Sequence, residues 1–282
     1  MTQIASTDNS GQLRDKTIAV LGAGKMGSLI LRSLLNSGVV ERSHLRGSVK
    51  HNEHAQELRE SLQISVGTSN LEAARNADVV ILCVKPSGVS KVVEAIRQVL
   101  SPNVLVISIA TGVTTDGIEA VLDDGVPVIR AMPNTACRIA RGMTALCAGK
   151  CCQESHMAIA EAIFSLMGKT AEVDEIHMDA VTGLSASGPA FIYIVLEALA
   201  EGGVRVGLPR EVATNFAAHA ALGAASMVLS TGEHPAVLKD EVTTPGGCTI
   251  DGILELEEGN IRATLIKAIT TTTRKASQLA RS

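Results

Sequence analysis

The sequence predicts an α/β protein in which a doubly wound parallel sheet is followed by an all-helical C-terminal domain. Apolar runs of strand length alternate with helical segments through the first half of the chain, and the first of these runs leads into a glycine-rich turn. After Glu175 the pattern becomes helical throughout. We therefore expect a flexible tail over 1–15, a first domain over 16–173 and a second over 174–282.

The opening unit, over 17–35, is a strand, a tight turn and a helix. Residues 17–21, which are rich in apolar and β-branched side chains, lead into Gly22-Ala23-Gly24-Lys25-Met26-Gly27, and an apolar periodic run follows. In a dinucleotide-binding fold the first glycine allows the turn, the second lets a pyrophosphate approach the backbone, and the third lets helix and strand pack closely. The helix N-terminus then favours the phosphates. This context predicts a nucleotide site, although the motif alone is also compatible with a turn that merely happens to be glycine-rich.

The remaining strands and helices of the first half follow from the same alternation. Strands are expected over 45–49, 64–66, 78–84, 104–110 and 127–131, with helices over 53–62, 88–100 and 114–122, and the segments 143–147 and 171–173 around a helix over 155–167 extend the sheet. Continuous apolar strands indicate a sheet that helices cover on both faces. Together with the glycine motif, this pattern predicts a Rossmann-type domain.

The second half reads as helices over 179–204, 210–229, 235–242, 249–257 and 260–279. Small side chains crowd the second of these helices: Ala217, Ala218, Ala220, Ala221, Gly223, Ala224 and Ala225. A helix with such small side chains approaches another helix closely. A dimer interface and packing within one chain are both compatible with this feature.

The charge and the apolar pattern limit the expected partners. A net charge of -4, with one Tyr, three Phe and no Trp, argues against nucleic-acid binding. The longest apolar stretch, 190–200 with one glutamate, is too short to span a bilayer, and the polar first 15 residues do not resemble a signal peptide. We therefore expect a cytoplasmic protein that binds neither nucleic acid nor a membrane.

The six cysteines do not indicate a metal site. None is spaced as CxxC, and the sequence holds no HExxH or similar histidine pair. The adjacent Cys151 and Cys152 are compatible with a redox pair, but a reduced pair on the solvent side is the simpler reading for a cytosolic chain. No metal is expected.

The end of the second expected strand bears on the choice of nicotinamide cofactor. An NAD site usually carries Asp or Glu there to accept the ribose 2′-hydroxyl, whereas a 2′-phosphate favours a cation. The sequence is Ser48-Val49-Lys50-His51-Asn52, and the first acid is Glu53. This favours NADP, while an ordinary solvated turn at Lys50 and His51 is the alternative.

A loop in the helical half, over 241–250, has the composition of a binding site. It joins two helices through hydroxyl residues, a proline and the paired glycines Gly246 and Gly247. Backbone N–H groups beside a helix start, with Thr243, Thr244 and Thr249 as further donors, would receive a small carboxylate. A loop that only caps the next helix is equally compatible with these residues.

Motifs along nearly the whole chain resemble the pyrroline-5-carboxylate reductase family, which catalyses the last step of proline biosynthesis. They are GAGKMG at Gly22, CVKP at Cys83, RAMPNT at Arg130, GMTAL at Gly142, SASGPAF at Ser185, EHP at Glu233 and LKDEVTTPGGCTI at Leu238. The last is far more specific than the glycine motif. The order and the spacing of these motifs make coincidence improbable.

The resemblance implies an oxidoreductase that transfers hydride from NADPH, with NADH as the other candidate, to the C=N carbon of 1-pyrroline-5-carboxylate. By analogy Gly22, Gly24, Lys25, Met26 and Gly27 bind the pyrophosphate, Lys50 and His51 lie near the adenosine ribose, and Asn70, Val84, Lys85, Pro86, Ala110, Thr111, Met132, Pro133 and Asn134 line the cofactor cleft. Val242, Thr244, Gly246, Gly247, Cys248 and Thr249 would hold the substrate, with the catalytic Thr249 near the ring nitrogen. A homodimer is implied, with the all-helical C-terminal domain as its dimerisation domain and a decamer of dimers as a larger assembly.

Some positions depart from the family pattern. Ala136 stands where many members have Pro, Arg138 and Arg141 add positive charge, and Cys248 replaces a small residue. A related cyclic imine therefore stays open as the substrate. A β-hydroxyacid-type dehydrogenase needs a lysine on the first long helix, and none occurs between Lys169 and Lys239. A catalytically silent NADP-binding scaffold is the remaining alternative.

Overall fold

The structure, a computed structural model, describes residues 4–5 and 10–279 of the 282-residue chain. The chain forms two compact units. The first comprises residues 1–186 together with 271–282, and the second comprises residues 187–270. The expected domain boundary after Val173 lies upstream of this division.

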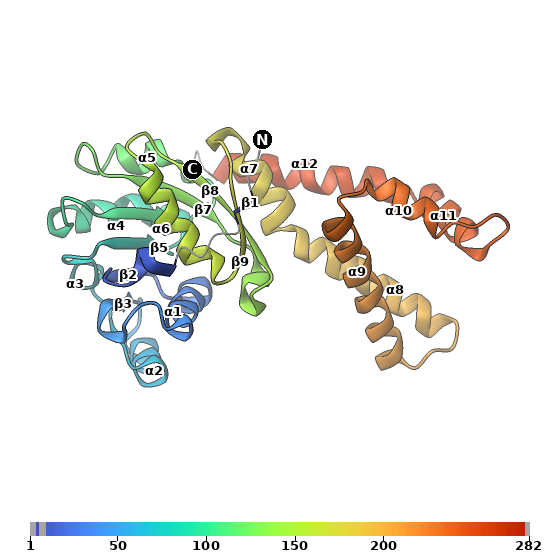
Figure 1. Cartoon of the computed structure of the whole chain (residues 1–282), viewed down its shortest axis with the longest axis horizontal. Helices are drawn as coiled ribbons and strands as arrows, with labels where there is room; N and C mark the ends of the chain where they lie inside the picture. The colour runs from blue at the N-terminus through green and yellow to red at the C-terminus, as the bar shows by residue number, and fades with distance from the viewer. Residues whose placement is uncertain (1–3, 6–9, 280–282) are drawn as a thin grey trace. The chain divides into compact units, whose positions relative to one another are not determined.

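The first unit is built on a nine-stranded sheet within the described residues, in the order β1-β9-β8-β7-β6-β5-β2-β3-β4 (Figure 1). Its strands are β1 (Ile4–Ala5), β2 (Ile18–Leu21), β3 (Leu45–Ser48), β4 (Ser65–Gly67), β5 (Val79–Leu82), β6 (Leu105–Ser108), β7 (Val128–Met132), β8 (Gly142–Ala148) and β9 (Gly168–Glu172). The strands from β4 to β7 run parallel, which confirms the doubly wound fold.

The sheet is not parallel throughout, because β8 runs antiparallel to β7 and β1 runs antiparallel to β9. Only residues 133–141 join β7 to β8, and they contain a 3₁₀ turn (Thr135–Ile139). A parallel connection needs a crossover of roughly a dozen residues or more. The short connection therefore returns the chain in the opposite direction.

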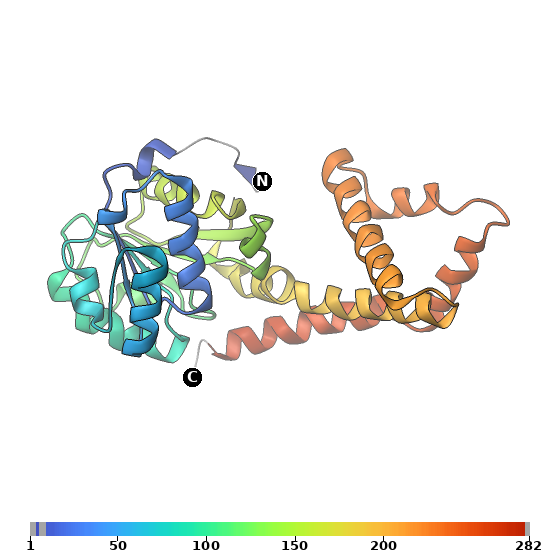
Figure 2. The same ribbon diagram turned by 90° about the horizontal axis from the view of Figure 1, so that it is seen from below.

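Helices cover both faces of the sheet (Figure 1, and from below in Figure 2). One face packs against α1 (Lys25–Ser37), α2 (Asn52–Leu62) and α6 (Glu154–Ser165), and the other against α3 (Asn70–Ala74), α4 (Val89–Ile96) and α5 (Thr115–Glu119). Successive residues of β5 alternate between the two cores: Val79 and Ile81 join the first, Val80 and Leu82 the second. This two-sided burial explains why the strands are continuously apolar.

The segment expected to be a loose tail is partly ordered. Leu13 is fully buried in the first core, and Ile4 and Ala5 pair with Ala171 and Thr170 of β9. The tail prediction is therefore wrong at these residues, because Leu13 packs into the core and the backbone of residues 4–5 pairs with the edge of the sheet. The rest of that prediction, on residues 1–3 and 6–9, lies outside the described residues.

The helical half begins with α7 (Met178–Val181) and a π-helical turn (Thr182–Ala186), both of which belong to the first unit. The second unit holds α8 (Gly188–Arg205), α9 (Arg210–Thr231), α10 (Pro235–Glu241), α11 (Cys248–Glu258) and the first part of α12 (Ile261–Leu279), up to Thr270. The predicted helix over 179–204 is thus interrupted by the π turn.

Small residues bring α8 and α9 together within the second unit. Ala200, Ala213 and Ala217 are buried there, and a Cβ added at Gly203 would lie 2.9 Å from the Cβ of Ala213. Other small residues of α9, such as Ala218 and Ala224, remain exposed. Of the small residues on α9, Ala213 and Ala217 therefore pack within the chain, whereas others stay exposed.

Two helical segments, Glu175–Arg205 and Arg210–Thr231, are long and apolar enough to cross a membrane by length and composition alone. The expectation that no apolar stretch reaches this length is wrong, because the isolated charged residues do not lower the mean hydropathy enough. Helices that pack against other helices pass the same test. Length and composition therefore do not distinguish the two environments here.

Candidate active site

The parallel strands place most of the expected cofactor residues at one edge of the sheet. Leu21, Ser48, Leu82 and Ser108 are register partners at the carboxyl ends of β2, β3, β5 and β6. The segments that follow carry the expected residues: the glycine turn 22–27, then 50–51, 84–86, 110–111 and, from the last residue of β7 onward, 132–134. Ligands of doubly wound sheets bind at this edge.

The first glycine makes the turn between β2 and α1. Gly22 has a φ of 85°, and a Cβ at this position would lie 2.8 Å from Cγ1 of Val84. The N–H groups of Gly22 and Ala23 both donate to the carbonyl of Ser48, at 3.0 and 2.8 Å. The turn is therefore fixed against the ends of both β3 and β5.

The other two glycines differ in their surroundings. Gly24 is exposed, and an added Cβ would find only the Gly22 carbonyl, at 4.0 Å. At Gly27 an added Cβ would lie 2.9 Å from that carbonyl and 3.1 Å from Cγ1 of Val20. Gly24 therefore leaves the approach to the backbone open, and Gly27 lets α1 pack on β2. The N–H groups in the first turn of α1 have no acceptors within the helix. The residues fit a dinucleotide pyrophosphate.

The end of β3 offers no carboxylate for a ribose 2′-hydroxyl. Ser48 is fully buried there, and its Oγ donates to Oδ1 of Asn70 at 2.6 Å. Lys50 and His51 are exposed, and Glu53 is exposed in the first turn of α2. The chemistry of this corner fits a 2′-phosphate better than a free 2′-hydroxyl.

One residue near the glycine turn escaped the sequence analysis. The Nε2–H of His54, on α2, donates to the carbonyl of Ala23 at 3.1 Å. His54 lies 31 positions from Ala23. No local pattern marks it, because the contact arises only when α2 packs beside the turn.

Asn134 is held by two hydrogen bonds at the end of the RAMPNT motif. Its Oδ1 accepts from the N–H of Ala136 at 3.1 Å, and its Nδ2 donates to Oγ of Ser185, in the π turn, at 3.4 Å. Met132 and Pro133, just before it, are buried. This segment, which is expected to line the cofactor cleft, is therefore held in place at Asn134.

Arg130, in the same motif, is 1% exposed and pairs with Glu175 and Asp179. Burial and the Glu175 carboxylate raise the pKa of the nearby Cys147 thiol to about 12. Cys147 therefore stays a thiol near neutral pH. From the sequence, Arg130 was recognised only as part of a motif, although a charge inside an apolar strand is a signal that marks it.

A groove of about 1180 Å³ runs beside the glycine-turn helix. It extends along α1 from Lys25 to Ser37, and Arg138 and Ile139 line its other side. Arg138, one of the two added cations, thus lies on the same groove as Lys25. Arg141 is exposed and is not among the residues that line it.

The expected substrate residues lie in the second unit, between α10 and α11. Gly246 has a φ of 70°, the N–H of Gly247 donates to the carbonyl of Thr244 at 3.0 Å, and an added Cβ at Gly247 would lie 2.6 Å from Oγ1 of Thr244. The glycines are therefore required for a tight turn that ends where α11 begins, at Cys248.

The hydroxyl groups of this loop have different partners. Oγ1 of Thr243 donates to the carbonyl of Lys239 at 2.8 Å, so Thr243 closes α10 and is not oriented as a ligand donor. Val242, Thr244 and Cys248 are exposed, and Thr249 is half-buried in the first turn of α11. Thr249 thus lies beside the free N–H groups of that helix start.

The cysteines and acids form no metal centre in the described part of the chain, where no group of three or more His, Cys, Asp or Glu side chains is placed to hold an ion. Cys151 is exposed, whereas Cys152 is half-buried and its Sγ donates to the carbonyl of Val128 at 3.1 Å. The expected solvent-side position therefore holds for Cys151 alone.

Comparison with known proteins matches both halves of the chain. Residues 175–279 match the family described as pyrroline-5-carboxylate reductase dimerisation, and residues 17–112 match NADP oxidoreductase coenzyme F420-dependent. Pyrroline-5-carboxylate reductases of Arabidopsis thaliana and Methanosarcina acetivorans are each 40% identical to the chain, over 94% and 95% of it and 96% and 99% of their own length.

Solved structures give the same result. A pyrroline-5-carboxylate reductase from Coxiella burnetii has a TM-score of 0.87 at 34% identity, and a Plasmodium falciparum pyrroline carboxylate reductase with NADP bound has 0.86 at 27%. Each similarity covers 95% of this chain and 99% of the other. The likeness therefore includes the sheet and the helices alike.

Proposed function

Since the chain belongs to the pyrroline-5-carboxylate reductase family, we propose that it reduces the C=N bond of 1-pyrroline-5-carboxylate to L-proline with NADPH, the final step of proline biosynthesis. The observation that carries this proposal is the glycine turn, whose three glycines each have the surroundings that a bound dinucleotide requires. When bound, NADPH supplies the hydride. The chain's own residues hold and orient the two reactants.

The cofactor is proposed to lie along the carboxyl edge of the sheet. Gly22, Gly24, Lys25, Met26 and Gly27 hold the pyrophosphate, Lys50 and His51 hold the 2′-phosphate, and Asn70, Val84, Lys85, Pro86, Ala110, Thr111, Met132, Pro133 and Asn134 line the cleft. NADPH is preferred over NADH because no carboxylate follows β3 before Glu53 and Lys50 is exposed beside it. A positive charge there favours the extra phosphate.

The substrate is proposed to bind the loop before α11, through Val242, Thr244, Gly246, Gly247, Cys248 and Thr249. Free N–H groups at the start of α11, an eleven-residue helix, favour the carboxylate. A protonated imine is already electrophilic, so the chain needs no nucleophile or strong acid. Thr249 Oγ1 accepts the N–H of the ring and orients it, an effect that can contribute several kcal/mol.

The chain is an oligomer-forming protein, since its helical half matches a dimerisation family. We propose a homodimer as the basic assembly and a decamer of dimers as the larger one. We also propose a cytoplasmic location, as for an enzyme of amino-acid biosynthesis that uses a soluble substrate and cofactor.

The test mixes purified protein with DL-1-pyrroline-5-carboxylate and NADPH and measures the oxidation of NADPH from the decrease in its absorbance. The same assay with NADH ranks the cofactors, and the six-membered analogue 1-piperideine-6-carboxylate tests the ring size. We expect rapid turnover of the five-membered ring with NADPH. Activity on the larger ring alone would change the substrate, and no activity on either would favour a silent NADP-binding scaffold.

A pair of variants tests the proposed catalytic residue, Thr249. Thr249→Ala should lower turnover about 10-fold or more, because an oriented hydrogen bond to the reacting ring is lost. Thr243→Ala is the matched control, since Thr243 lies in the same loop but its hydroxyl donates to the carbonyl of Lys239 on α10. If Thr249→Ala kept the wild-type turnover, Thr249 would not orient the imine.

A further inference from the structure

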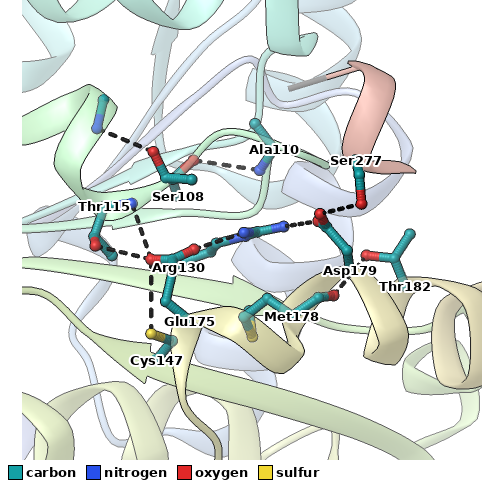
Figure 3. A network of polar contacts seen from close by, with 12 residues as sticks. Ser108, Ala110, Thr115, Arg130, Cys147, Glu175, Met178, Asp179, Thr182 and Ser277 are labelled. Carbon is teal, nitrogen blue, oxygen red and sulfur yellow. Dashed lines mark hydrogen bonds and ion pairs between the residues drawn. The ribbon is translucent and has the colours of Figure 1, made fainter. Parts of the chain in front are cut away.

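Arg130 is the one charged side chain that is buried in the described part of the chain. Its Nη1 donates to Oε1 of Glu175 at 2.6 Å and its Nη2 donates to Oδ1 of Asp179 at 3.0 Å (Figure 3). Figure 3 shows the guanidinium between the two carboxylates. Neither carboxylate is more than 28% exposed, so both ion pairs are shielded from water.

The carboxylates connect Arg130 to three further segments of the first unit. Oε2 of Glu175 accepts from the N–H and Oγ1 of Thr115, at 3.1 and 2.8 Å, and from Cys147 Sγ at 3.7 Å. Oδ2 of Asp179 accepts from Ser277 Oγ at 2.8 Å. We call these six residues the Arg130 network.

A buried ion network of this kind fixes geometry more than it adds stability. Removing charges from water costs several kcal/mol per ion, which the pairing only repays when every group is satisfied. Replacing such pairs by apolar residues is often neutral for stability. The Arg130 network is therefore better explained by what it holds in place.

Two segments of the proposed cofactor cleft are attached to the network. Arg130 precedes Met132–Asn134 on β7, and Thr115 follows Ala110 and Thr111 after β6. One carboxylate, that of Glu175, thus joins Arg130 within β7 to Thr115, the first residue of α5, which follows β6. Both segments of the proposed cofactor cleft are therefore connected to the Arg130 network, one through Thr115 and the other through Arg130.

Asn134, at the end of the segment that follows Arg130, is bonded to the turn that continues from α7. Asp179 lies on α7, α7 continues into the π turn, and Ser185 of that turn accepts from Asn134 at 3.4 Å. The chain from Arg130 to Asn134 is therefore held at both ends by one continuous segment. Such π turns are frequent at functional sites.

We propose that Arg130 and Glu175 are positioning residues for the reduction: they hold segments 110–115 and 132–134 in place, without touching cofactor or substrate. The inference rests on the proposed function for its kinetic consequence. A misplacement of about 1 Å between reacting atoms can cost about 100-fold in rate. Loss of the network should therefore slow the chemical step more than it weakens binding.

The main test variant is Glu175→Gln, which keeps the size of the side chain and removes its charge. We expect kcat to fall about 10- to 100-fold while KM for NADPH changes by less than about 3-fold. The primary isotope effect with NADPH deuterated at the transferred position should increase, because the chemical step becomes more rate-limiting. Lys150→Gln is the control, since it breaks an exposed ion pair with Asp116 in the same unit.

A second readout needs neither turnover nor bound cofactor. Hydrogen exchange of amides in 110–115 and 132–136 should be faster in Glu175→Gln than in the wild type and in Lys150→Gln. Thr115→Val, which removes one hydroxyl donor from Glu175, should shift exchange and kcat in the same direction by a smaller amount, and serves if Glu175→Gln does not fold.

The outcomes separate this proposal from the proposed function. A lower melting temperature with unchanged kcat, isotope effect and local exchange would make the network purely structural and overturn the proposal. A rise in KM for NADPH with kcat unchanged would overturn it too, because Glu175 would then act in binding. If the wild type does not reduce 1-pyrroline-5-carboxylate, the proposed function fails, and the exchange data alone decide whether the network holds the two segments.

Discussion

The two units differ in where their apolar side chains lie. In the first unit the strands and covering helices bury two continuous cores, whereas the second buries only Ala200, Ala213 and Ala217 among its described residues. Its large apolar residues stay exposed in the single chain, including Leu229 at 84%, Val206 at 80% and Phe216 at 67%. The first unit is therefore complete within one chain, and the second needs another surface to cover it.

The largest expected effect comes from placing a charge on the exposed apolar face of α9. Phe216→Glu should prevent assembly and lower activity by about 100-fold or more, because a buried unpaired charge is costly at an interface. Light scattering measures the molar mass. Asn215→Glu adds the same charge to the neighbouring residue, which points to another side of the helix, and should assemble normally. If Phe216→Glu kept the molar mass of the wild-type assembly, the exposed apolar face of the second unit would not be the surface through which the chains associate.

A change in the first unit should leave assembly intact and remove cofactor binding. The side chain of Gly27→Val would collide with the Gly22 carbonyl and Val20, since a Cβ alone lies 2.9 and 3.1 Å from them. Displacement of α1 from β2 should weaken NADPH binding about 100-fold, measured by quenching or enhancement of NADPH fluorescence. Gly88→Ala, where an added Cβ meets nothing within 4 Å, is the control. Loss of the oligomer in Gly27→Val would show that the units do not fold independently.

The choice of cofactor should also reside in the first unit alone. Lys50→Ala should raise KM for NADPH about 10-fold and leave KM for NADH nearly unchanged, because only NADPH carries the phosphate that the cation would contact. Steady-state kinetics with both cofactors give the ratio. Equal changes for the two would assign Lys50 to the solvated surface.

The smallest effect concerns acid stability of the first unit. His156 Nδ1 accepts from the N–H of Gln153 at 3.0 Å, at the start of α6, and burial with the charge of Lys16 lowers the pKa of His156 below its ordinary 6.5. The neutral ring is the one that stabilises the fold, so its contribution is present above pH 6.5 and is lost as pH falls through the lowered pKa.

His156→Ala should therefore lower the melting temperature by about 1–3 °C at pH 7.5 and by less in acid. Calorimetry at several pH values measures this difference. A constant difference across the range would mean that the proton on His156 has no role in the cap.

The elements of the sheet were predictable from sequence because their signals are local. Continuous apolar runs gave the positions of β2, β5 and β6 within a few residues, and the glycine turn was placed correctly between β2 and α1. The antiparallel direction of β8 was not predicted, since it depends on the length of the connection after Met132. Short α3 was missed as well, although Ser69 caps it by accepting from Glu72 N–H.

The candidate site was predictable only where a motif carried it. The glycine turn and the loop before α11 were recognised from residue types and spacing. The partners of Arg130 were not, because Glu175 and Asp179 lie 45 and 49 positions away and meet it only when the 3₁₀ turn Glu175–His177 and α7 pack beside the sheet. The contact of His54 with Ala23 has the same origin.

A hydrogen bond from Ser277, on α12, to Asp179 completes the polar contacts of α7 in the first unit. Ser277 lies 98 positions after its partner Asp179, with the whole second unit between them. During synthesis the sheet is complete once β9 has left the ribosome, but this last hydrogen bond waits for almost the entire chain. We therefore expect chains truncated before α12 to hold a folded sheet with an unfinished α7, and protease resistance of α7 to appear only in chains long enough to include Ser277.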